Sequence, residues 1–243
     1  QENDKRVVIK IVNQSDGSGA TIASTIQANQ TAGFSIVTFT GTGTAGSLEH
    51  GLSQAPEFVI FKRLDGTQDW LVGTEPTTWE KHLFLNGTDT VADTNITWND
   101  TAPTNTLFYV GTGNSSNKAS SPFVAYMWHS VEGYSKIGSY VGNGNANGAY
   151  VYTGFKPSWL LYKNISTASQ WWLYDNARNT FNPVTRSFRA NASNAEETGS
   201  SIIVDFLSNG FKQRSGNFTD SNETGDTYIY MAFAEHPFLG DGT

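Results

Sequence analysis

Tryptophan residues that stand beside carboxylate, amide and guanidinium groups are the strongest candidates for chemistry in this sequence. Sugar-binding sites place an aromatic ring against the apolar face of a sugar and use such polar groups to bind its hydroxyls. Two groups at corresponding places in the chain have this composition, namely Asp69 with Trp70, and Trp171, Trp172, Asp175, Asn176 and Arg178. Because side chains alternate along a strand, we expect one of Trp171 and Trp172 to face the core and the other to face outward.

A second candidate is an acidic segment that imitates the first half of a calcium loop. Asp220, Asn222 and Asp226 place oxygen atoms at alternate positions, and a glycine precedes Asp226 where the backbone must turn. The twelfth position of such a loop should be a glutamate, but here it is Met231. The counterpart segment in the first half, residues 114–118, has no acidic residue. A solvated polar hairpin therefore explains the pattern better, and calcium is the only cofactor that the sequence suggests.

Catalytic constellations are missing from the sequence. It contains no Gly-x-Ser-x-Gly nucleophile elbow, no cysteine and no strand with alternating carboxylates of the kind that glycosidases use. The four histidines stand in unrelated contexts, at His50, His82, His129 and His236. We therefore expect a protein that is not an enzyme, and a carbohydrate-active enzyme remains the less favoured alternative.

The elements that must position these residues are β-strands. Short apolar runs rich in Val, Ile, Phe, Tyr and Trp are bounded by Gly, Asn, Asp or Pro, and 13% of the residues are aromatic. The runs also repeat at a spacing of about a hundred residues. The matched segments are 33–43 with 133–144, 56–62 with 157–163, 69–72 with 171–174, and 123–128 with 228–233. The sequence predicts an all-β protein, a duplicated antiparallel β-sandwich or jelly roll of lectin-like type, with one repeat in residues 33–132 and the other in 133–243.

Residues 1–32 precede the repeat and are expected to form a strand arm on a flexible tether. The strand-like run contains the apolar residues Val7, Val8, Ile9, Ile11 and Val12. Two interpretations stay open: an edge strand on the chain's own sheet, or an arm that adds to a neighbouring subunit of a homo-oligomer.

Charge and hydropathy exclude two classes of partner. The formal net charge is -7, and the basic residues are mostly scattered, so no surface is expected to neutralise nucleic-acid phosphates. No apolar run approaches the ~18 residues that would cross a bilayer, so membrane insertion is not expected either. The beginning of the sequence, at Gln1, carries no basic-then-apolar signal segment.

Several long motifs resemble one family. They are GFSIVTFTGTGTAG, HGLSQAPEFVIFKR, WNDTAPT, GSYVGNGNANGAYVYTGFKPSWLLYK, IVDFLSNGFKQRS and TYIYMAFAEHPF. Residues 33–238 resemble a domain of unknown function that recurs in tail-fibre and other virion-surface proteins of tailed, often marine, bacteriophages. Relatives usually carry Phe-Ala-Glu where this chain has Trp128, His129 and Ser130, so any role of that glutamate is in doubt here.

The resemblance implies a place on the virion and no reaction. Combined with the aromatic groups, it suggests a tail-fibre or receptor-binding component that engages a host-surface polysaccharide and contacts other virion proteins. The alternative is a capsid decoration or fibre-building protein without a ligand.

Overall fold

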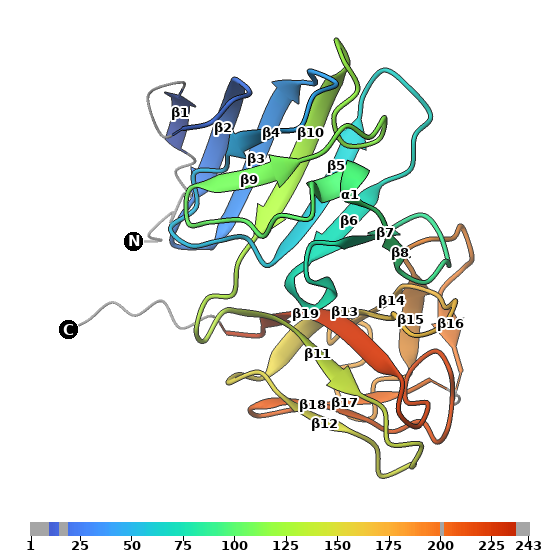
Figure 1. Cartoon of the computed structure of the whole chain (residues 1–243). Helices are drawn as coiled ribbons and strands as arrows, with labels where there is room; N and C mark the ends of the chain where they lie inside the picture. The colour runs from blue at the N-terminus through green and yellow to red at the C-terminus, as the bar shows by residue number, and fades with distance from the viewer. Residues whose placement is uncertain (1–9, 15–18, 200–201, 237–243) are drawn as a thin grey trace, which may run out of the picture. The chain divides into compact units, whose positions relative to one another are not determined.

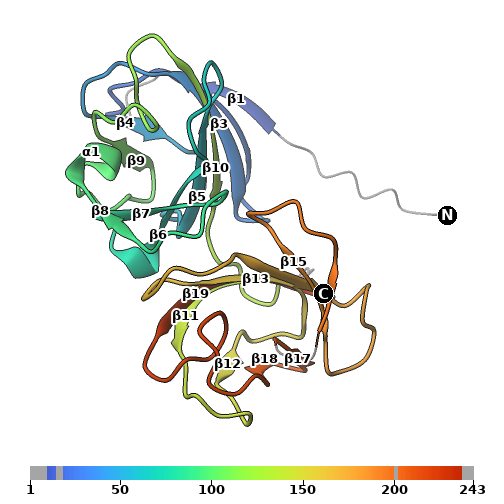
Figure 2. The same ribbon diagram turned by 90° about the vertical axis from the view of Figure 1, so that its right-hand side faces the viewer.

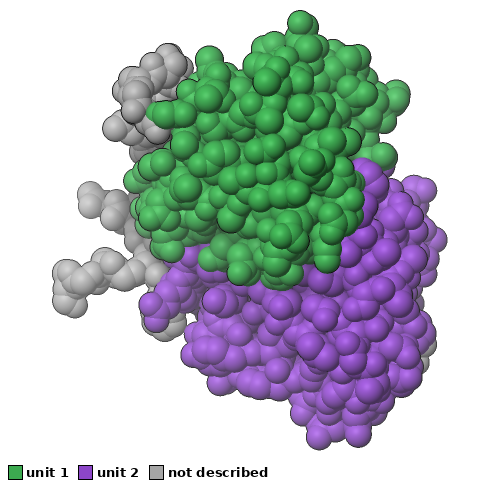
Figure 3. Space-filling view, viewed as in Figure 1, with its two compact units in different colours: residues 1–82, 93–129 green, residues 83–92, 130–243 purple. Residues whose placement is uncertain are grey.

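The computed structural model describes residues 10–14, of which only the backbone is described, together with residues 19–199 and 202–236. Contacts divide the chain into two compact units (Figure 3). Unit 1 comprises residues 1–82 and 93–129, and unit 2 comprises residues 83–92 and 130–243. Nearly all regular structure in the described ranges is β-strand, and no helix there is long and apolar enough to cross a membrane. The all-β prediction is confirmed.

Unit 1 is built on an antiparallel sheet that faces a smaller one (Figures 1 and 2). The larger sheet has the order β1 (Lys10–Gln14), β2 (Ser24–Asn29), β3 (Phe34–Thr40), β10 (Pro122–Trp128), β5 (Phe58–Arg63), β6 (Leu71–Thr74), β7 (Lys81–Phe84) and β8 (Ala92–Asp93). The smaller sheet pairs β4 (Gly46–Glu49) with β9 (Leu107–Val110). Two short helices complete the unit, the 3-10 helix η1 (Glu75–Thr77) and α1 (Asn95–Trp98).

The core of unit 1 lies between these layers and is largely aromatic. In β3 the side chains alternate, with Val37 and Phe39 buried and Thr38 exposed, as one face of a sheet packs on a core. The ring of Phe61 in β5 lies 5.1 Å from that of Trp98 in α1 and 5.4 Å from that of Phe108 in β9. Burial of these large rings therefore joins the main sheet, the helix and the second sheet.

Unit 2 is also a two-layer antiparallel sandwich (Figure 1). One sheet has the order β11 (Ser135–Val141), β19 (Thr227–Ala234), β13 (Pro157–Asn164), β14 (Trp172–Asp175), β15 (Arg186–Arg189) and β16 (Glu197–Thr198). The other has the order β12 (Tyr150–Tyr152), β18 (Gly210–Gln213) and β17 (Val204–Leu207). The core between them includes Tyr140, Tyr162 and Tyr228 from the first sheet and Phe211 from the second.

The matched sequence segments occupy matching strands. The central order β3-β10-β5-β6 of unit 1 has the same pattern as β11-β19-β13-β14 of unit 2, and every one of these neighbours is antiparallel. The segments that repeat in the sequence form these strands in the same succession. A common origin of the two units by duplication stays a prediction.

The amino-terminal region differs from the predicted arm and tether. Strand β1 pairs with the chain's own β2, with Ile11 opposite Gln27 and Val12 opposite Ile26. Strand β2 lies within the expected tether and pairs in turn with β3. This pairing is the edge-strand interpretation of the run, since β1 is the outermost strand of the chain's own sheet. A contact of Ile11 and Val12 with another subunit stays a prediction. Val7, Val8 and Ile9 lie outside the described residues.

The compact units differ from the predicted repeats at three places. Unit 1 includes strands that precede residue 33, and residues 83–92 and 130–132, expected in the first repeat, group with unit 2. The Thr88 carbonyl in the first of these two segments accepts hydrogen bonds from the Lys163 side chain, at 3.0 Å, and from the Ser169 backbone, at 2.8 Å. Such contacts between distant segments leave no local trace in the sequence.

Candidate functional site

A small hollow in unit 2 has the composition of a binding site for a polar ligand. Its volume is about 220 Å³, which is below the ~300–1,000 Å³ of typical pockets for drug-sized ligands. It is lined by Lys156, Asn176, Asn179, Thr180, Phe181, Asn182, Val184 and Phe206. We call it the unit 2 hollow. Its size suits one small unit, such as a single sugar ring.

The segment between β14 and β15 that forms most of this hollow is fixed by its asparagines. The Asn179 side-chain oxygen accepts the backbone N–H groups of Thr185, at 3.1 Å, and Arg186, at 2.8 Å. The Asn182 side chain pairs with the Phe206 backbone in both directions, at 2.9 Å each. Val184 forms a β-bridge with Val204. These bonds hold the segment against β17, so the hollow is formed before any ligand arrives.

Two polar groups of the hollow remain available. Since the Asn179 oxygen accepts two backbone N–H groups, its Nδ2 is directed away from them, and within the described ranges it makes no hydrogen bond. The Thr180 hydroxyl likewise has no hydrogen-bond partner there, and this residue is exposed. An amide donor and a hydroxyl group together can bind the hydroxyls of a ligand.

An aromatic side chain and an apolar base accompany these polar groups. Phe181 is 84% exposed, the largest exposed fraction among the large hydrophobic residues described. Val184 and Phe206 are buried and give the hollow apolar lining. An aromatic face beside amides and a hydroxyl is the combination that fits the two faces of a sugar ring.

The charged groups around the hollow neutralise one another. Lys156 Nζ lies 2.7 Å from Glu235 Oε2, and the Asn176 amide donates to Glu235 Oε1 at 2.7 Å. The hydrogen bond from Lys156 lowers the pKa of Glu235. Arg178 pairs with Asp175 and, at 3.0 Å, with Glu196. The hollow therefore carries balanced charge and offers no unpaired ion to a charged ligand.

The structure separates the second predicted tryptophan group into buried and surface residues. Asn176 lines the hollow, and Asp175 and Arg178 form the adjacent ion pair. Both Trp171 and Trp172 are buried, each 1% exposed, so the expectation that one faces outward is wrong. Trp171 precedes β14, outside the strand alternation, and donates from Nε1 to the Phe84 carbonyl at 2.8 Å. Neither ring is available to stack on a ligand.

The first predicted group remains on the surface of unit 1. Trp70 is 37% exposed and Asp69 is exposed, at the turn before β6. The Lys62 ammonium lies 5.5 Å from the centre of the Trp70 ring, a cation–π contact. The two predicted groups thus differ, because Trp70 is exposed whereas the tryptophans of unit 2 are buried.

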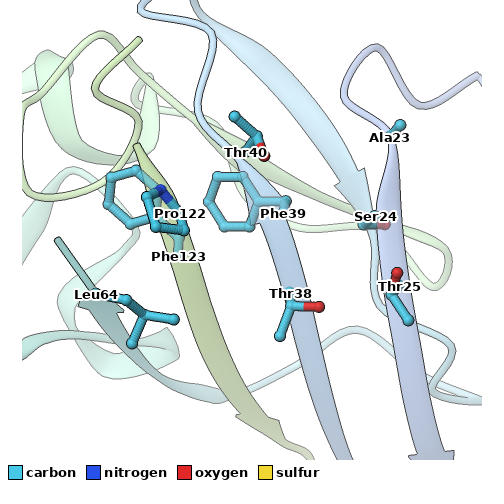
Figure 4. A pocket seen from close by; sticks show the side chains of 9 residues that line it. All are labelled: Ala23, Ser24, Thr25, Thr38, Phe39, Thr40, Leu64, Pro122 and Phe123. Carbon is cyan, nitrogen blue, oxygen red and sulfur yellow. The ribbon is translucent and has the colours of Figure 1, made fainter. Parts of the chain in front are cut away.

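A second hollow, on unit 1, has fewer polar functions. Its volume is about 390 Å³, and it lies at the ends of β2, β3 and β10 (Figure 4). Thr25 and Thr38 stand on paired strands with Leu64 and Pro122 beside them. Its lining contains hydroxyl and apolar groups but no charged or amide side chain. It lacks the mixed donor set of the unit 2 hollow.

The predicted calcium segment has a structural role in the hydrogen-bond network. Asn222 is fully buried and its Nδ2 donates to the carbonyls of Asn145, at 2.9 Å, and Ser215, at 3.0 Å. Asp220 accepts from the Ser169 hydroxyl, and Asp226 accepts from the Asn164 amide. Asp220, Asn222 and Asp226 thus face different partners. No group of three metal-ligating acidic, His or Cys side chains lies within the described ranges.

Unit 1 shows the same arrangement at Asn117. This side chain is also fully buried and donates to the carbonyls of Thr44, at 2.7 Å, and Gly111, at 2.9 Å. In both units the backbone carbonyl of the asparagine also accepts the N–H of a turn glycine at 2.8 Å. The glycine is Gly43 for Asn117 and Gly144 for Asn222. The recurrence of Asn with the Gly-x-Gly turn was the sequence signal for this role, and reasoning from acidic residues alone missed it.

The residues of the unit 2 hollow were mostly missed as well. Among its lining residues, only Asn176 belongs to a group that the sequence pattern predicted to bind a ligand. A usable signal was present in the polar run from Asn176 to Asn182, which lies between two strands and ends at Pro183. Long connections of this kind often carry binding residues.

Comparison with known proteins adds a family but no characterised relative. No curated protein matches the chain, and no solved structure matches it. One family model covers residues 11–237, nearly the whole sequence. The chain belongs to the family described as Domain of unknown function (DUF7483).

Proposed function

We propose that this chain is a non-catalytic carbohydrate-binding component of a bacteriophage virion surface, and that it engages a host-surface glycan through the unit 2 hollow. The resemblance of residues 33–238 to tail-fibre and other virion-surface domains supports the location. The observation that carries the binding role is the meeting of exposed Phe181 with the unengaged Asn179 amide and Thr180 hydroxyl in one preformed hollow.

The hollow supplies both kinds of contact that a sugar ring requires. The Phe181 ring provides a flat apolar surface for the C–H groups, and Asn179 Nδ2 and the Thr180 hydroxyl bind ring hydroxyls. The hydrogen bonds that fix Asn179 and Asn182 reduce the entropy lost on binding. Because the surrounding charges are paired, the site favours an uncharged sugar over an acidic one.

The same residues support binding without turnover. Lys156 and Asn176 hold Glu235 and lower its pKa, and Asp175 is engaged in an ion pair with Arg178. A general acid needs a carboxyl that retains its proton near neutral pH. Neither carboxylate has the environment for that task.

The test is sugar binding by the purified chain, measured on a glycan array and by calorimetry with neutral monosaccharides. We expect Phe181→Ala to lower affinity about tenfold, as for loss of an aromatic contact worth ~1.5 kcal/mol. Thr180→Val, which removes only the hydroxyl, should have a smaller effect in the same direction. Trp70→Ala removes an exposed aromatic ring from unit 1 and is the matched control, which should bind normally.

The outcomes separate the alternatives. Loss of binding in Trp70→Ala, with normal binding by Phe181→Ala, would move the site to unit 1. Absence of binding to every neutral and acidic glycan tested would favour a capsid decoration or fibre-building role. Release of shortened sugars during incubation would contradict a non-catalytic function.

A further inference from the structure

Strand β12 has an edge whose backbone groups are unused. In the β12–β18 pair, Thr153 N–H bonds the Asn209 carbonyl and Gln213 N–H bonds the Ala149 carbonyl. Antiparallel pairs alternate between hydrogen-bonded and non-hydrogen-bonded positions, so the N–H and C=O groups of Tyr150 and Tyr152 point away from β18. Within the described ranges no backbone hydrogen bond beyond this strand pair uses them.

The corresponding edge in unit 1 is occupied. Strand β4 pairs with β9 as β12 pairs with β18, with Leu48 opposite Phe108 and Val151 opposite Phe211. One residue before Leu48 is Ser47, which therefore corresponds to Tyr150. The Ser47 carbonyl accepts backbone N–H groups from the segment that precedes β2, and its N–H donates to a threonine hydroxyl of that segment.

The segment that occupies the β4 edge is short and bends at Thr21 and Ile22, before β2 begins. Thr21 N–H and Ile22 N–H bond the Ser47 carbonyl at 3.1 and 3.0 Å, and Ser47 N–H bonds Thr21 Oγ1 at 2.8 Å. The approach is close, since a Cβ on Gly46 would lie 2.6 Å from Thr21 Oγ1. The pattern that binds the edge of β4 is thus a residue with a hydroxyl, Thr21, followed by an aliphatic residue, Ile22.

Side chains are buried on the strand whose edge is occupied and exposed on the strand whose edge is open. Ser47 is 4% and Glu49 is 6% exposed on the covered strand, whereas Tyr150 is 46% and Tyr152 is 65% exposed on the open one. Both tyrosine rings project from one face of β12, because they are two residues apart. Tyrosine is enriched at protein interfaces, where it combines apolar area with a hydroxyl.

We propose that the β12 edge accepts a short segment of another polypeptide chain with the pattern hydroxyl-aliphatic, as the β4 edge accepts the segment of residues 19–22. The incoming backbone N–H groups bond the Tyr150 carbonyl, and a hydroxyl side chain accepts the Tyr150 N–H. An aliphatic side chain then packs beside the exposed tyrosine rings. This main-chain pairing at a sheet edge is independent of sugar binding in the unit 2 hollow.

The probe is a capped peptide with the sequence of residues 19–25, Gly-Ala-Thr-Ile-Ala-Ser-Thr. It is titrated to several millimolar into the full chain labelled with nitrogen-15, and binding is followed by amide chemical shifts. We expect saturable shifts centred on Tyr150 and Tyr152. The control peptide is N-methylated at the residues that correspond to Thr21 and Ile22, which removes the two backbone N–H groups that bond the edge.

Two variants at one position separate edge pairing from side-chain contact. Tyr150→Pro removes the outward N–H and leaves the bonds to β18 intact, because that N–H does not face β18. It should weaken peptide binding about tenfold, because one hydrogen bond and the contact with the tyrosine ring are lost. Tyr150→Ser introduces the residue of unit 1 and retains the backbone, so it should weaken binding less. Amide exchange of β18 checks that both variants stay folded.

Three results would overturn the proposal. They are no saturable shift at the highest peptide concentration, equal binding of the N-methylated peptide, or equal binding by Tyr150→Pro. Shifts at Tyr150 and Tyr152 that arise only with oligosaccharides would instead make this face a glycan contact. A change of mass in solution that depends on Tyr150 without any peptide would make it an interface between two copies of the chain.

Discussion

The two units build similar aromatic cores from different residues. In unit 1 the rings of Phe39 and Phe123 stack at 5.0 Å with an interplanar angle of 10°, and in unit 2 those of Tyr140 and Tyr228 stack at 4.9 Å and 9°. Ring shape and position are thus retained while a hydroxyl group is added. The comparison separates what ring packing contributes to a sandwich from what core hydrogen bonds contribute.

The added hydroxyls attach the core of unit 2 to one loop. Tyr140 donates to the Ser221 carbonyl at 2.9 Å and accepts from Gln213 Nε2 at 2.9 Å. Tyr228 donates to the Thr219 carbonyl at 2.8 Å and accepts the Glu223 N–H at 2.9 Å. Burial raises the pKa of Tyr140 well above its ordinary value, so the hydroxyl stays protonated. The loop around Asn222 is therefore held by tyrosines as well as by its buried amide, whereas the equivalent rings of unit 1, Phe39 and Phe123, have no hydroxyl to bond the loop around Asn117.

The largest effect should follow removal of the buried asparagines. Asn117→Ala and Asn222→Ala each leave buried carbonyl and N–H groups without partners, so each should cost about 3 kcal/mol or more. We expect Asn117→Ala to cost more, since the tyrosine hydroxyls still hold the loop in unit 2. Amide hydrogen exchange resolved by peptide measures each unit separately. Equal losses of stability in the two variants would show that the tyrosine hydroxyls do not stabilise the loop around Asn222.

Acid should destabilise unit 1 through His50. Its Nδ1 accepts the Leu52 N–H at 3.2 Å and its Nε2 donates to the Thr104 carbonyl at 3.1 Å, so the neutral ring satisfies both sites. Burial lowers the pKa of His50 to about 4 from 6.5. Stability from the neutral ring is complete above pH 6.5 and is lost as the pH falls through 4, by up to about 3 kcal/mol.

Hydrogen exchange between pH 7 and 4 tests this sign. Peptides of unit 1 should lose protection before those of unit 2, in which the described histidine, His236, is exposed. His50→Gln, which lacks a titratable group, should flatten the response of unit 1. Burial also lowers the pKa of His82, so a smaller dependence of the same sign should remain in that variant. An acid response confined to unit 2 would contradict the assignment.

Much of the fold could be predicted from the sequence, because strands and turns are local signals. The repeated turns and apolar runs indicated the central strands of both units. Strand β2 was missed because its sequence, Ser-Thr-Ile-Gln-Ala-Asn, has one fully buried apolar residue, Ile26. Its strand structure comes from pairing with β1 and β3, which no local pattern shows.

The candidate site was less predictable for a related reason. Whether a tryptophan is exposed depends on what packs over it, and Trp171 is bonded by a carbonyl 87 positions earlier in the chain. Asn179 and Thr180 are candidate ligand-binding residues because the Asn179 Nδ2 and the Thr180 hydroxyl make no hydrogen bond within the described ranges. Which polar groups remain without partners is decided only when the chain has folded. Composition identified sugar-binding chemistry as the expectation, and the described geometry shifts the candidate aromatic contact from the tryptophans to Phe181.

A moderate effect should follow Tyr140→Phe. The change introduces the residue of unit 1 and keeps the ring, but it removes a hydroxyl that both donates and accepts within the core. The Ser221 carbonyl and Gln213 amide would lose a partner, so we expect a loss of about 1–3 kcal/mol in unit 2. The reverse change, Phe39→Tyr, places a hydroxyl where unit 1 has Val110 in the position of Gln213 and should destabilise unit 1. Urea unfolding followed by exchange measures both, and a neutral Tyr140→Phe would show that the hydrogen bonds have no net value.

The smallest effect, and one of opposite sign, is expected for Tyr162→Phe. Tyr162 corresponds to Phe61 and is fully buried, and its hydroxyl has no hydrogen bond of ordinary geometry in the described part of the chain, although it interacts weakly with the Tyr174 hydroxyl. A buried polar group without a partner costs desolvation free energy, so its removal should stabilise unit 2 by up to about 1 kcal/mol despite the small cavity that is left. Tyr140→Phe is the matched control, because the two variants delete the same atom from adjacent rings of one core. A loss of stability in Tyr162→Phe as large as in Tyr140→Phe would mean that the hydroxyl has a partner in solution, and the contrast between the two units would then extend to every tyrosine of this cluster.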